Sequence, residues 1–425
     1  MRAVSALLVD SVFTTASAGR HVLEALKPYS TANGGPLTIR KVAYVEGRGN
    51  ILVSYPGTDA VECTSFVGMH LDVVPANPDT WTFPAFELTR EGDKLRGRGV
   101  TDCLGHVALV TRLLVALAKA KPVLRRTVHA VFIANEENSS TLGVGIDALV
   151  ANGELDALKA GPVLWVDTAD STPCIGTGGI AAWSLTASGK LFHSGIPQNA
   201  INAIELGSCA VTELQRRFNA KFPAHPQEKV YGYACASSMK PTQVSFPGGS
   251  VNQIPGQCTF SGDVRVTPFY KLEDVVAAID ADVADINANL ETALTPPGPH
   301  SRFVLPGEGL RGKLAMTWGE GTSRGLACDL SSPGYTAMRD AFTEVAGKCA
   351  PIAITGTLPC IADLQAAGFD VQCLGFGLLK TYHANDEYGL LSDFARGFRV
   401  LATIIANLER LVEASGEGPS KRARH

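Results

Sequence analysis

The stretch FVGMHLDVVPA, residues 66–76, decides how the rest of the sequence is interpreted, because here an apolar run ends in a histidine and an aspartate two positions apart. Side chains alternate along an extended strand, so one side of this strand would carry Phe66, Gly68, His70 and Asp72. A core strand that ends in His-x-Asp can present a metal ligand at the edge of a sheet. The same pair also fits a hydrogen-bonded surface histidine. The remaining sequence has to decide between these interpretations.

Short β-rich runs alternate with helical segments in the first part of the chain. The strand-like runs are NILVSYPG (50–57), ECTSFVGM (62–69), TVHAVFIANEE (127–137) and PVLWVDTAD (162–170). Between the second and third lies CLGHVALVTRLLVALAKAKP (103–122), whose apolar residues almost encircle a helix axis. Such a helix is buried, and Lys119, Lys121 and Pro122 mark its end. This alternation predicts an α/β fold with a sheet covered on both faces.

The character of the sequence changes near Gly178. The runs 180–195 and 256–270 indicate strands of a half-exposed antiparallel sheet, and the runs 200–218 and 271–290 indicate its helices. After about residue 320 the earlier α/β style returns. We therefore predict a larger α/β domain made of residues 1–178 and 320–425, with an α+β domain inserted at 179–319.

Composition narrows the possible partners and the compartment. The 425 residues carry a formal net charge of −4, so there is no basic surface to indicate nucleic acid binding. No apolar run reaches the length of about 18 residues that a membrane span needs. None of the ten cysteines forms a CxxC pair, which favours reduced thiols in the cytoplasm. Residues 1–22 indicate an amphipathic helix rather than a targeting peptide, and the basic tail 414–425 indicates a solvated terminus rather than a localisation signal.

Metal-ligand residues occur in five stretches, each near the end of a strand-like run or at a glycine turn before a helix. They are His70 with Asp72, Asp102 in RGRGVTDCLGH (96–106), Glu136 and Glu137 in FIANEEN (132–138), Asp167 in LWVDTAD (164–170) and His383 in KTYHANDEY (380–388). In an open α/β sheet, the carboxyl ends of the strands meet at one crevice. One edge of one sheet is therefore predicted to collect all of them.

Each stretch also has a plainer explanation. The adjacent glutamates could favour a helix N-terminus, Asp102 could be a helix cap, and Asp167 could lie in a turn. His383 could form a surface ion pair with Asp386 or Glu387. These explanations would have to coincide at every strand end, whereas one metal site accounts for all of them.

A pair of divalent ions needs this mixture of ligands. Ions about 3.5–4 Å apart repel one another, so a carboxylate has to bridge them. Two histidines and three carboxylates would give each ion one histidine, one terminal carboxylate and a share of the bridge, a set that suits Zn²⁺, or Co²⁺, better than Mg²⁺. Asp72 would hold the second ring nitrogen of His70, and one of the adjacent glutamates would take a proton from water.

With these residues in place, the sequence resembles the M20 family of metallopeptidases and deacylases. The matching motifs, in family order, are GMHLDVVPA (68–76), LRGRGVTDCLGHVALV (95–110), IANEEN (133–138), KLFHSGIPQNAINAIEL (190–206), NQIPGQCTFSGDVRVTP (252–268) and YHANDEY (382–388). The resemblance implies a di-metal α/β catalytic domain with an inserted α+β, ferredoxin-like lid domain. It also implies a homodimer formed through the lid.

The resemblance further implies a role for each motif residue in the catalytic domain. The first metal site would consist of His70, Asp102 and Asp167, and the second of Asp102, Glu137 and His383. Asp102 would bridge the ions through a loop with a cis Asp102–Cys103 peptide. Glu136 would be the general base, and Asp72 the partner of His70.

In the lid, the resemblance implies that His193 stabilises the oxyanion in the partner subunit's site, and that Asn252 and Arg265 grip the substrate carboxylate. Their plainer explanations are a turn histidine, a loop cap and a surface arginine. The backbone amides of Gly356 and Thr357 would also hold a carboxylate, although relatives usually have Gly-Thr-Ser-Asp where this chain has GTLP.

A second departure lies at the bridge, where many relatives have Asp-(Met/Asp)-Lys-Gly and this chain has DCLGH (102–106), so that His106 replaces a lysine.

Within the family, the stretches 167–179 and 240–270 are most similar to the acetylornithine deacetylases of plant-like eukaryotes. This resemblance implies hydrolysis of a small N-acyl amino acid, N-acetyl-L-ornithine, in arginine and ornithine metabolism. The alternatives are another N-acyl amino acid, a dipeptide, a C-terminal glutamate, or a metal-binding relative without catalytic activity.

Overall fold

The computed structural model describes residues 16–59, 61–138 and 141–414. Most of the predicted first helix and all but the first residue of the basic tail lie outside these residues. The chain divides into two compact units. Unit 1 comprises Met1–Ile175, Cys328–Ile352 and Pro359–His425, and unit 2 comprises Gly176–Ala327 and Ala353–Leu358.

The limits of unit 2 differ from the sequence-based limits 179–319 and include one additional segment. Residues 353–358 belong to unit 2 because Ile354 donates its backbone N–H to Gly176 (2.9 Å) and Gly178 donates to Gly356 (2.7 Å). An antiparallel bridge between Ile180 and Ser323 attaches residues that follow 319. Hydrogen bonds between segments far apart in sequence set these limits, and no local sequence pattern records them.

Unit 1 is built around an eight-stranded sheet with the order β1-β2-β6-β3-β7-β18-β8-β17. Its strands are β1 Thr38–Val45, β2 Arg48–Tyr55, β3 Cys63–His70, β6 Thr127–Ile133, β7 Pro162–Thr168, β8 Thr172–Gly176, β17 Ile352–Ala353 and β18 Asp370–Gly375. The central strands β6, β3, β7 and β18 are parallel, whereas β1, β2 and β8 pair antiparallel. The carboxyl ends of the parallel strands therefore meet at one edge of the sheet, and the α/β prediction is confirmed.

Strand β3 is irregular just before His70. All residues of β3 are buried, and its pairing with β6 shifts register between Phe66 and Met69. Gly68 lies within this shift at φ +93°, where a Cβ would lie 2.5 Å from the ring of Trp165, so only glycine fits. The predicted placement of Phe66, Gly68, His70 and Asp72 on one side is therefore wrong, because the bulge changes the direction in which the end of the strand points.

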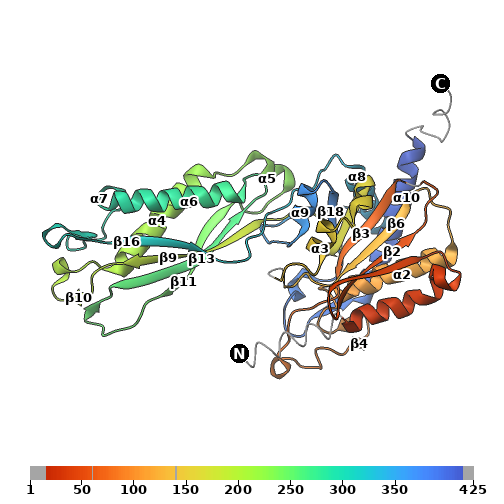
Figure 1. Ribbon diagram of the computed structural model, residues 1–425, viewed down its shortest axis with the longest axis horizontal. Helices are drawn as coiled ribbons and strands as arrows, with labels where there is room; N and C mark the ends of the chain where they lie inside the picture. Colours follow the sequence, from red (N-terminus) through yellow and green to blue (C-terminus); the bar gives the residue numbers. More distant parts are fainter. Residues whose placement is uncertain (1–15, 60, 139–140, 415–425) are drawn as a thin grey trace. The chain divides into compact units, whose positions relative to one another are not determined.

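Helices cover both faces of the sheet of unit 1 (Figure 1). They are residues 16–26, α2 Leu104–Ala120, α3 Ile146–Ala151, α8 Pro333–Ala346, α9 Ile361–Ala366 and α10 Leu391–Ala414. Helix 16–26, α2, α8 and α10 share one apolar core with the sheet, and the buried residues of α3 and α9 lie outside it. Helix α2 ends where the sequence predicts, since Lys121 adopts the left-handed conformation before Pro122.

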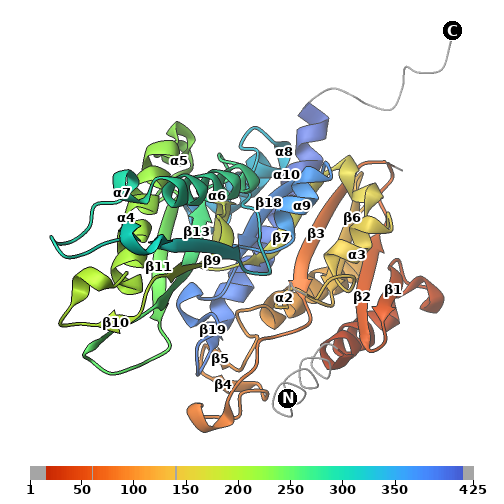
Figure 2. The same ribbon diagram turned by 60° about the vertical axis from the view of Figure 1, so that its left-hand side comes forward.

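A small three-stranded sheet connects two distant parts of unit 1 (Figure 2). It pairs β4 Thr89–Glu91 with β5 Lys94–Arg96, and β5 with β19 Tyr388–Leu390. The segment before Asp102 is thereby tied to the segment after His383. Among the described residues of unit 1, short 3₁₀ helices lie at Lys27–Tyr29, Thr31–Asn33, Pro78–Thr80, Asp156–Ala160 and Leu379–Thr381.

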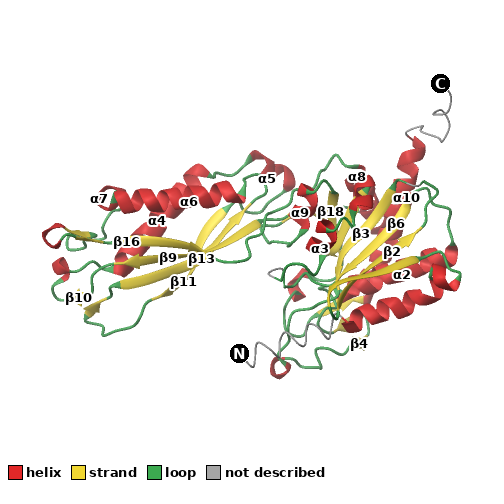
Figure 3. Cartoon of the chain, viewed as in Figure 1, coloured by secondary structure: helices red, strands yellow, loops and turns green. Residues whose placement is uncertain are grey.

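Unit 2 has the β-α-β-β-α-β order of a ferredoxin-like fold. Its antiparallel sheet has the order β11-β13-β9-β16, and α4 and α6 lie on one face of it (Figure 3). The main elements are β9 Gly179–Ser188, α4 Ala203–Lys221, β11 Ser238–Ser245, β13 Gln257–Val266, α6 Leu272–Ala288 and β16 Lys313–Trp318. The short ones are β10 Phe192–His193, α5 Pro226–Tyr231, β12 Gln253–Ile254, α7 Leu290–Ala293, β14 Val304–Leu305 and β15 Leu310–Arg311, with 3₁₀ turns at Pro197–Asn199 and Pro306–Glu308.

Within residues 16–59, 61–138 and 141–414, no helix combines the length and the low polarity that crossing a membrane requires. All ten cysteines are free thiols.

Candidate metal centre

The predicted metal ligands gather at the carboxyl edge of the parallel strands of unit 1. His70 is the last residue of β3, and Asp167 is the penultimate residue of β7. Glu136 and Glu137 follow the end of β6 after two intervening residues. Neighbouring parallel strands thus bring these side chains to one place, although the residues are far apart in sequence.

Asp102 lies at the centre of the cluster, in the loop before α2. Its Oδ1 is 2.9 Å from Nε2 of His70, and its Oδ2 is 3.1 Å from Nε2 of His383. Each oxygen of one carboxylate therefore faces a different histidine, which is the arrangement that a bridging ligand requires. The Asp102–Cys103 peptide is cis.

Two further carboxylates complete the groups on either side of Asp102. Asp167 Oδ1 lies 3.4 Å from Nε2 of His70, and Glu137 Oε2 lies 3.1 Å from Nε2 of His383. The structure therefore brings together both predicted ligand sets. His383 is the exposed member, with 55% of its side chain accessible, whereas the other ligands are largely buried.

Asp72 contacts His70 chiefly through its main chain. Nδ1 of His70 lies 2.8 Å from the backbone oxygen of Asp72 and 3.5 Å from its carboxylate. A carbonyl can only accept, so Nδ1 carries a proton, and Nε2 is the ring nitrogen that faces the carboxylates. The Asp72 carboxylate instead accepts the backbone N–H of Glu136 at 3.2 Å and lies 3.8 Å from Arg48. Asp72 therefore orients the imidazole of His70 as expected, but through its backbone oxygen rather than its carboxylate.

Glu136 is buried next to the ligands without being paired to either histidine. Burial raises the pKa of its carboxyl group well above the ordinary value, and Asp167, Glu137 and Asp102 raise it further. Arg48 fixes the preceding turn, since it donates to the backbone oxygen of Ala134 (3.0 Å) and to Oδ1 of Asn135 (2.7 Å). A carboxyl group held in this way suits a general base.

The electrostatics of the cluster fit divalent cations. Burial raises the pKa of Asp167 to about 7. Burial opposes ionisation of Asp102 as well, but hydrogen bonds from His383 and His70 hold the pKa of Asp102 well below its usual value. The bonds from His383 to Asp102 and Glu137 raise the pKa of His383 to about 10.

Crowded buried carboxylates need positive charge nearby. Within the described residues, no lysine or arginine pairs with Asp102, Glu137 or Asp167. Moreover, Oε1 of Glu137 and Oδ1 of Asp167 are buried without a hydrogen-bond partner. Imidazole nitrogens and carboxylate oxygens within contact distance of one another are suitable ligands for divalent metal ions.

In unit 2, two predicted substrate residues lie side by side. His193 in β10 pairs in register with Gln253 of β12, next to Asn252, and Ser194 donates its backbone N–H to the oxygen of Asn252 at 2.9 Å. Both His193 and Asn252 are exposed. Nδ1 of His193 accepts the backbone N–H of Gly195 at 3.0 Å, which places the proton of the neutral ring on Nε2.

The other predicted substrate residues occupy separate positions in unit 2. Arg265 in β13 donates through Nε to Asp263 at 2.9 Å, and 32% of its side chain is exposed. Gly356 and Thr357 belong to the segment 353–358 that joins unit 2. Their backbone N–H groups donate no hydrogen bond to any described residue. Both groups are therefore available to donate to a carboxylate.

The sequence model of the peptidase family M20/M25/M40 matches residues 66–407. The chain belongs to this family. The motifs at 68–76, 95–110, 133–138 and 382–388 carry residues of the metal centre in unit 1, and the motifs at 190–206 and 252–268 lie in unit 2.

Two M20 relatives are similar over almost their whole length. An acetylornithine deacetylase of Arabidopsis thaliana is 56% identical over 393 residues, covering 92% of this chain and 89% of the relative. An acetylornithine deacetylase of Dictyostelium discoideum is 47% identical over 406 residues, covering 93% and 91%.

Solved structures share the fold at much lower identity. Human carnosine dipeptidase 1 matches with a TM-score of 0.63 at 17% identity, covering 91% of this chain and 88% of that one. A dinuclear metal-binding peptidase of the M20 family from Bacillus subtilis matches with a TM-score of 0.59 at 16% identity, covering 95% and 92%.

Glu387 is a residue of the M20 centre that the sequence interpretation missed. It is fully buried and accepts the backbone N–H groups of Gly99 (3.0 Å), Thr101 (2.8 Å) and Asp102 (3.2 Å), while Arg98 donates to it at 2.8 Å. The surface ion pair considered for Glu387 is therefore wrong. The carboxylate fixes the loop of Asp102 to the loop of His383.

Proposed function

We propose that this protein hydrolyses N-acetyl-L-ornithine to L-ornithine and acetate. The observation that carries this proposal is the identity of 56% and 47% to two acetylornithine deacetylases across more than nine tenths of the chain. The metal centre supports a hydrolase, because it combines a bridging carboxylate with an adjacent buried base. A binding protein would need the ligands but not Glu136.

The residues around Asp102 would hold two divalent ions. His70, Asp102 and Asp167 would hold one, and Asp102, Glu137 and His383 the other. Mixed imidazole and carboxylate ligands favour Zn²⁺, with Co²⁺ as the next choice. Bound ions of this kind lower the pKa of water and polarise an amide carbonyl.

Glu136 would move the protons. Its carboxylate would take a proton from the attacking water and later deliver it to the departing ornithine nitrogen, because an amide nitrogen leaves only after protonation. The raised pKa of Glu136 makes its carboxylate a stronger proton acceptor, and the carboxyl group that forms holds the proton that the departing nitrogen needs.

His193 would stabilise the oxyanion of the tetrahedral intermediate. Its Nδ1 is engaged by Gly195, so the Nε2–H remains as an outward donor. We place this donor in the partner subunit's site of a homodimer formed through unit 2. The guanidinium of Arg265, the amide of Asn252 and the free N–H groups of Gly356 and Thr357 would bind the substrate carboxylate. The ten free thiols suit a cytoplasmic enzyme of ornithine and arginine metabolism.

The test is a substrate panel with the purified protein loaded with Zn²⁺ or Co²⁺. N-acetyl-L-ornithine, N-acetyl-L-methionine, N-acetyl-L-glutamate and a dipeptide are compared by kcat/KM, and metal content is measured in parallel. We expect N-acetyl-L-ornithine to be preferred. A higher kcat/KM for any other member would refute the substrate, and metal binding without any hydrolysis would indicate the non-catalytic relative.

A further inference from the structure

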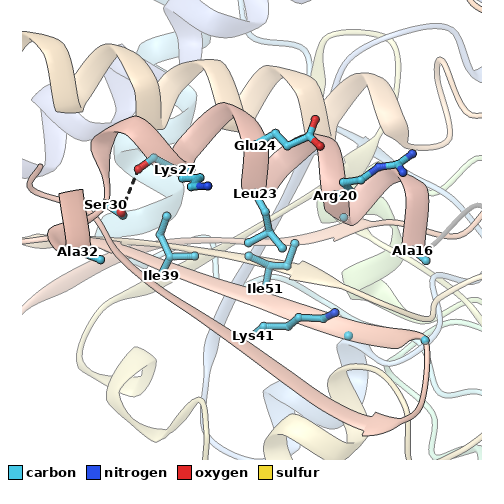
Figure 4. Close-up of a pocket in the computed structure, with 13 residues that line it drawn as sticks. Ala16, Arg20, Leu23, Glu24, Lys27, Ser30, Ala32, Ile39, Lys41 and Ile51 are labelled. Atoms are coloured by element: carbon cyan, nitrogen blue, oxygen red, sulfur yellow. Dashed lines mark hydrogen bonds between the residues drawn. The ribbon is translucent and has the colours of Figure 1, made fainter.

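A hollow of about 420 Å³ lies between helix 16–26 and the β1–β2 hairpin of unit 1. Figure 4 shows Leu23 of the helix and Ile39 and Ile51 of the hairpin meeting at its centre. Lys27 of the helix-side segment and Lys41 of β1 flank this apolar centre, and Arg20 lines the hollow from the helix with its guanidinium directed away from the hairpin. None of the lining residues belongs to the metal centre or to unit 2.

The hollow exists because the apolar face of the hairpin is interrupted. Ile39 lies opposite Val53 and Lys41 lies opposite Ile51, so these four side chains point to the face that packs on the helix. Lys41 stands where the pattern would place an apolar residue. Gly49 provides no side chain beside it, and a Cβ at this position would lie 2.4 Å from Cε of Lys41. A lysine and a glycine therefore take the place of the side chains that would fill the core.

The charge of the residues that line the hollow is mainly positive, with Arg20, Lys27 and Lys41 against Glu24. Within the described residues, neither Lys27 nor Lys41 forms an ion pair, and Arg20 contacts only the hydroxyl of Ser17 at 3.4 Å. The one acidic residue of the lining, Glu24, lies 3.9 Å from His21. Figure 4 shows its carboxylate directed away from the hairpin.

We propose that this hollow binds a small organic anion with an aliphatic body. The apolar centre would bury the body, and the ammonium groups of Lys27 and Lys41 would hold the acidic group. The volume lies within the range of about 300–1,000 Å³ that is usual for ligand sites. An anion is favoured over a neutral ligand because it supplies the charge that these cations lack.

Octanoate, a carboxylate with an aliphatic chain, is a suitable probe, and 1-octanol is its uncharged counterpart. Isothermal titration of the full chain should show octanoate binding more tightly than 1-octanol. Hydrogen exchange with octanoate present should slow the amides of residues 16–26 and 38–55 and leave those of unit 2 unchanged.

The variants separate charge from shape. Lys27→Gln combined with Lys41→Gln should weaken octanoate binding about three- to tenfold, because each exposed charge contributes modestly. Gly49→Ala should also weaken it by displacing Lys41. The matched control is Lys159→Gln, an exposed lysine of unit 1 paired with Asp156 outside the hollow; it should bind as the wild type does.

Three outcomes would overturn the proposal. Octanoate and 1-octanol could bind equally, which would show a merely apolar surface. Octanoate could bind with the lysine variants unaffected, which would place the anion elsewhere. Binding could appear only after residues 1–15 are removed, which would mean that the chain itself covers the hollow.

Discussion

Replacing His106 by glutamine tests how unit 1 supports the loop that leads to His383. His106 lies in α2, is fully buried, and its Nε2 accepts the backbone N–H of Phe376 at 2.8 Å, one residue beyond the end of β18. The rings of Phe376 and Phe394 pack against it. Only the neutral imidazole can accept this bond. Glutamine keeps an acceptor of similar reach and does not titrate.

The magnitude follows from the pKa of His106. Burial lowers this pKa from 6.5 to about 4. Below pH 6.5 the unfolded chain takes up a proton that the folded protein refuses until the pH approaches 4, so stability falls as the pH decreases through this window. A difference of this size corresponds to about 3 kcal/mol, since each pKa unit corresponds to about 1.4 kcal/mol.

The assay is the thermal midpoint of metal-free wild type and His106→Gln between about pH 7.5 and about pH 4.5. The wild type should lose about 5–10 °C more than the variant across this range. All other titrations are common to both proteins and cancel in the difference. His129→Gln is a matched control, because burial also lowers the pKa of His129, but less strongly, and the difference should be smaller. Parallel pH profiles for wild type and His106→Gln would refute the reasoning.

Three further results are expected. Glu136→Gln should lower kcat about 10²- to 10⁴-fold while metal content stays at the wild-type level; near-normal kcat would exclude Glu136 as the base. Glu387→Gln should destabilise unit 1 by about 3–5 kcal/mol in denaturant unfolding, because it leaves the buried guanidinium of Arg98 unpaired. An unchanged unfolding midpoint would contradict the role of Glu387 in fixing the loop of Asp102 to the loop of His383. Arg217→Met should destabilise unit 2 by about 1–2 kcal/mol, because Arg217 pairs with acidic residues of both α4 and α6. Arg216→Met, whose exposed side chain pairs only within α4, should cost under about 0.5 kcal/mol, and equal losses would argue against the role of Arg217.

Much of unit 1 could be predicted from local sequence. Strands β3 and β7 are mostly apolar because they are buried along their whole length, and α2 is apolar almost all round for the same reason. Once these runs are assigned to one parallel sheet, the residues after them must lie at one edge. His70, Asp167 and the glutamates after β6 were predictable on this ground.

Other features depend on contacts that only the folded chain makes. The bulge at Gly68 depends on the ring of Trp165, a residue of the neighbouring strand. Glu387 appeared to be a surface residue because its partners, the backbone amides around Asp102, carry no signature of their own in the sequence.

The sequence by itself determined which runs are apolar, where each ends, and which metal-binding residues follow them, because burial leaves a periodic record along the chain. The tertiary structure alone decided that a carbonyl orients His70, that residues 353–358 join unit 2, and that Lys41 faces a helix across a hollow. The first two features depend on backbone hydrogen bonds, and almost every residue type offers the same backbone groups. The third depends on the space left between two elements. The local order of side chains therefore encodes none of the three.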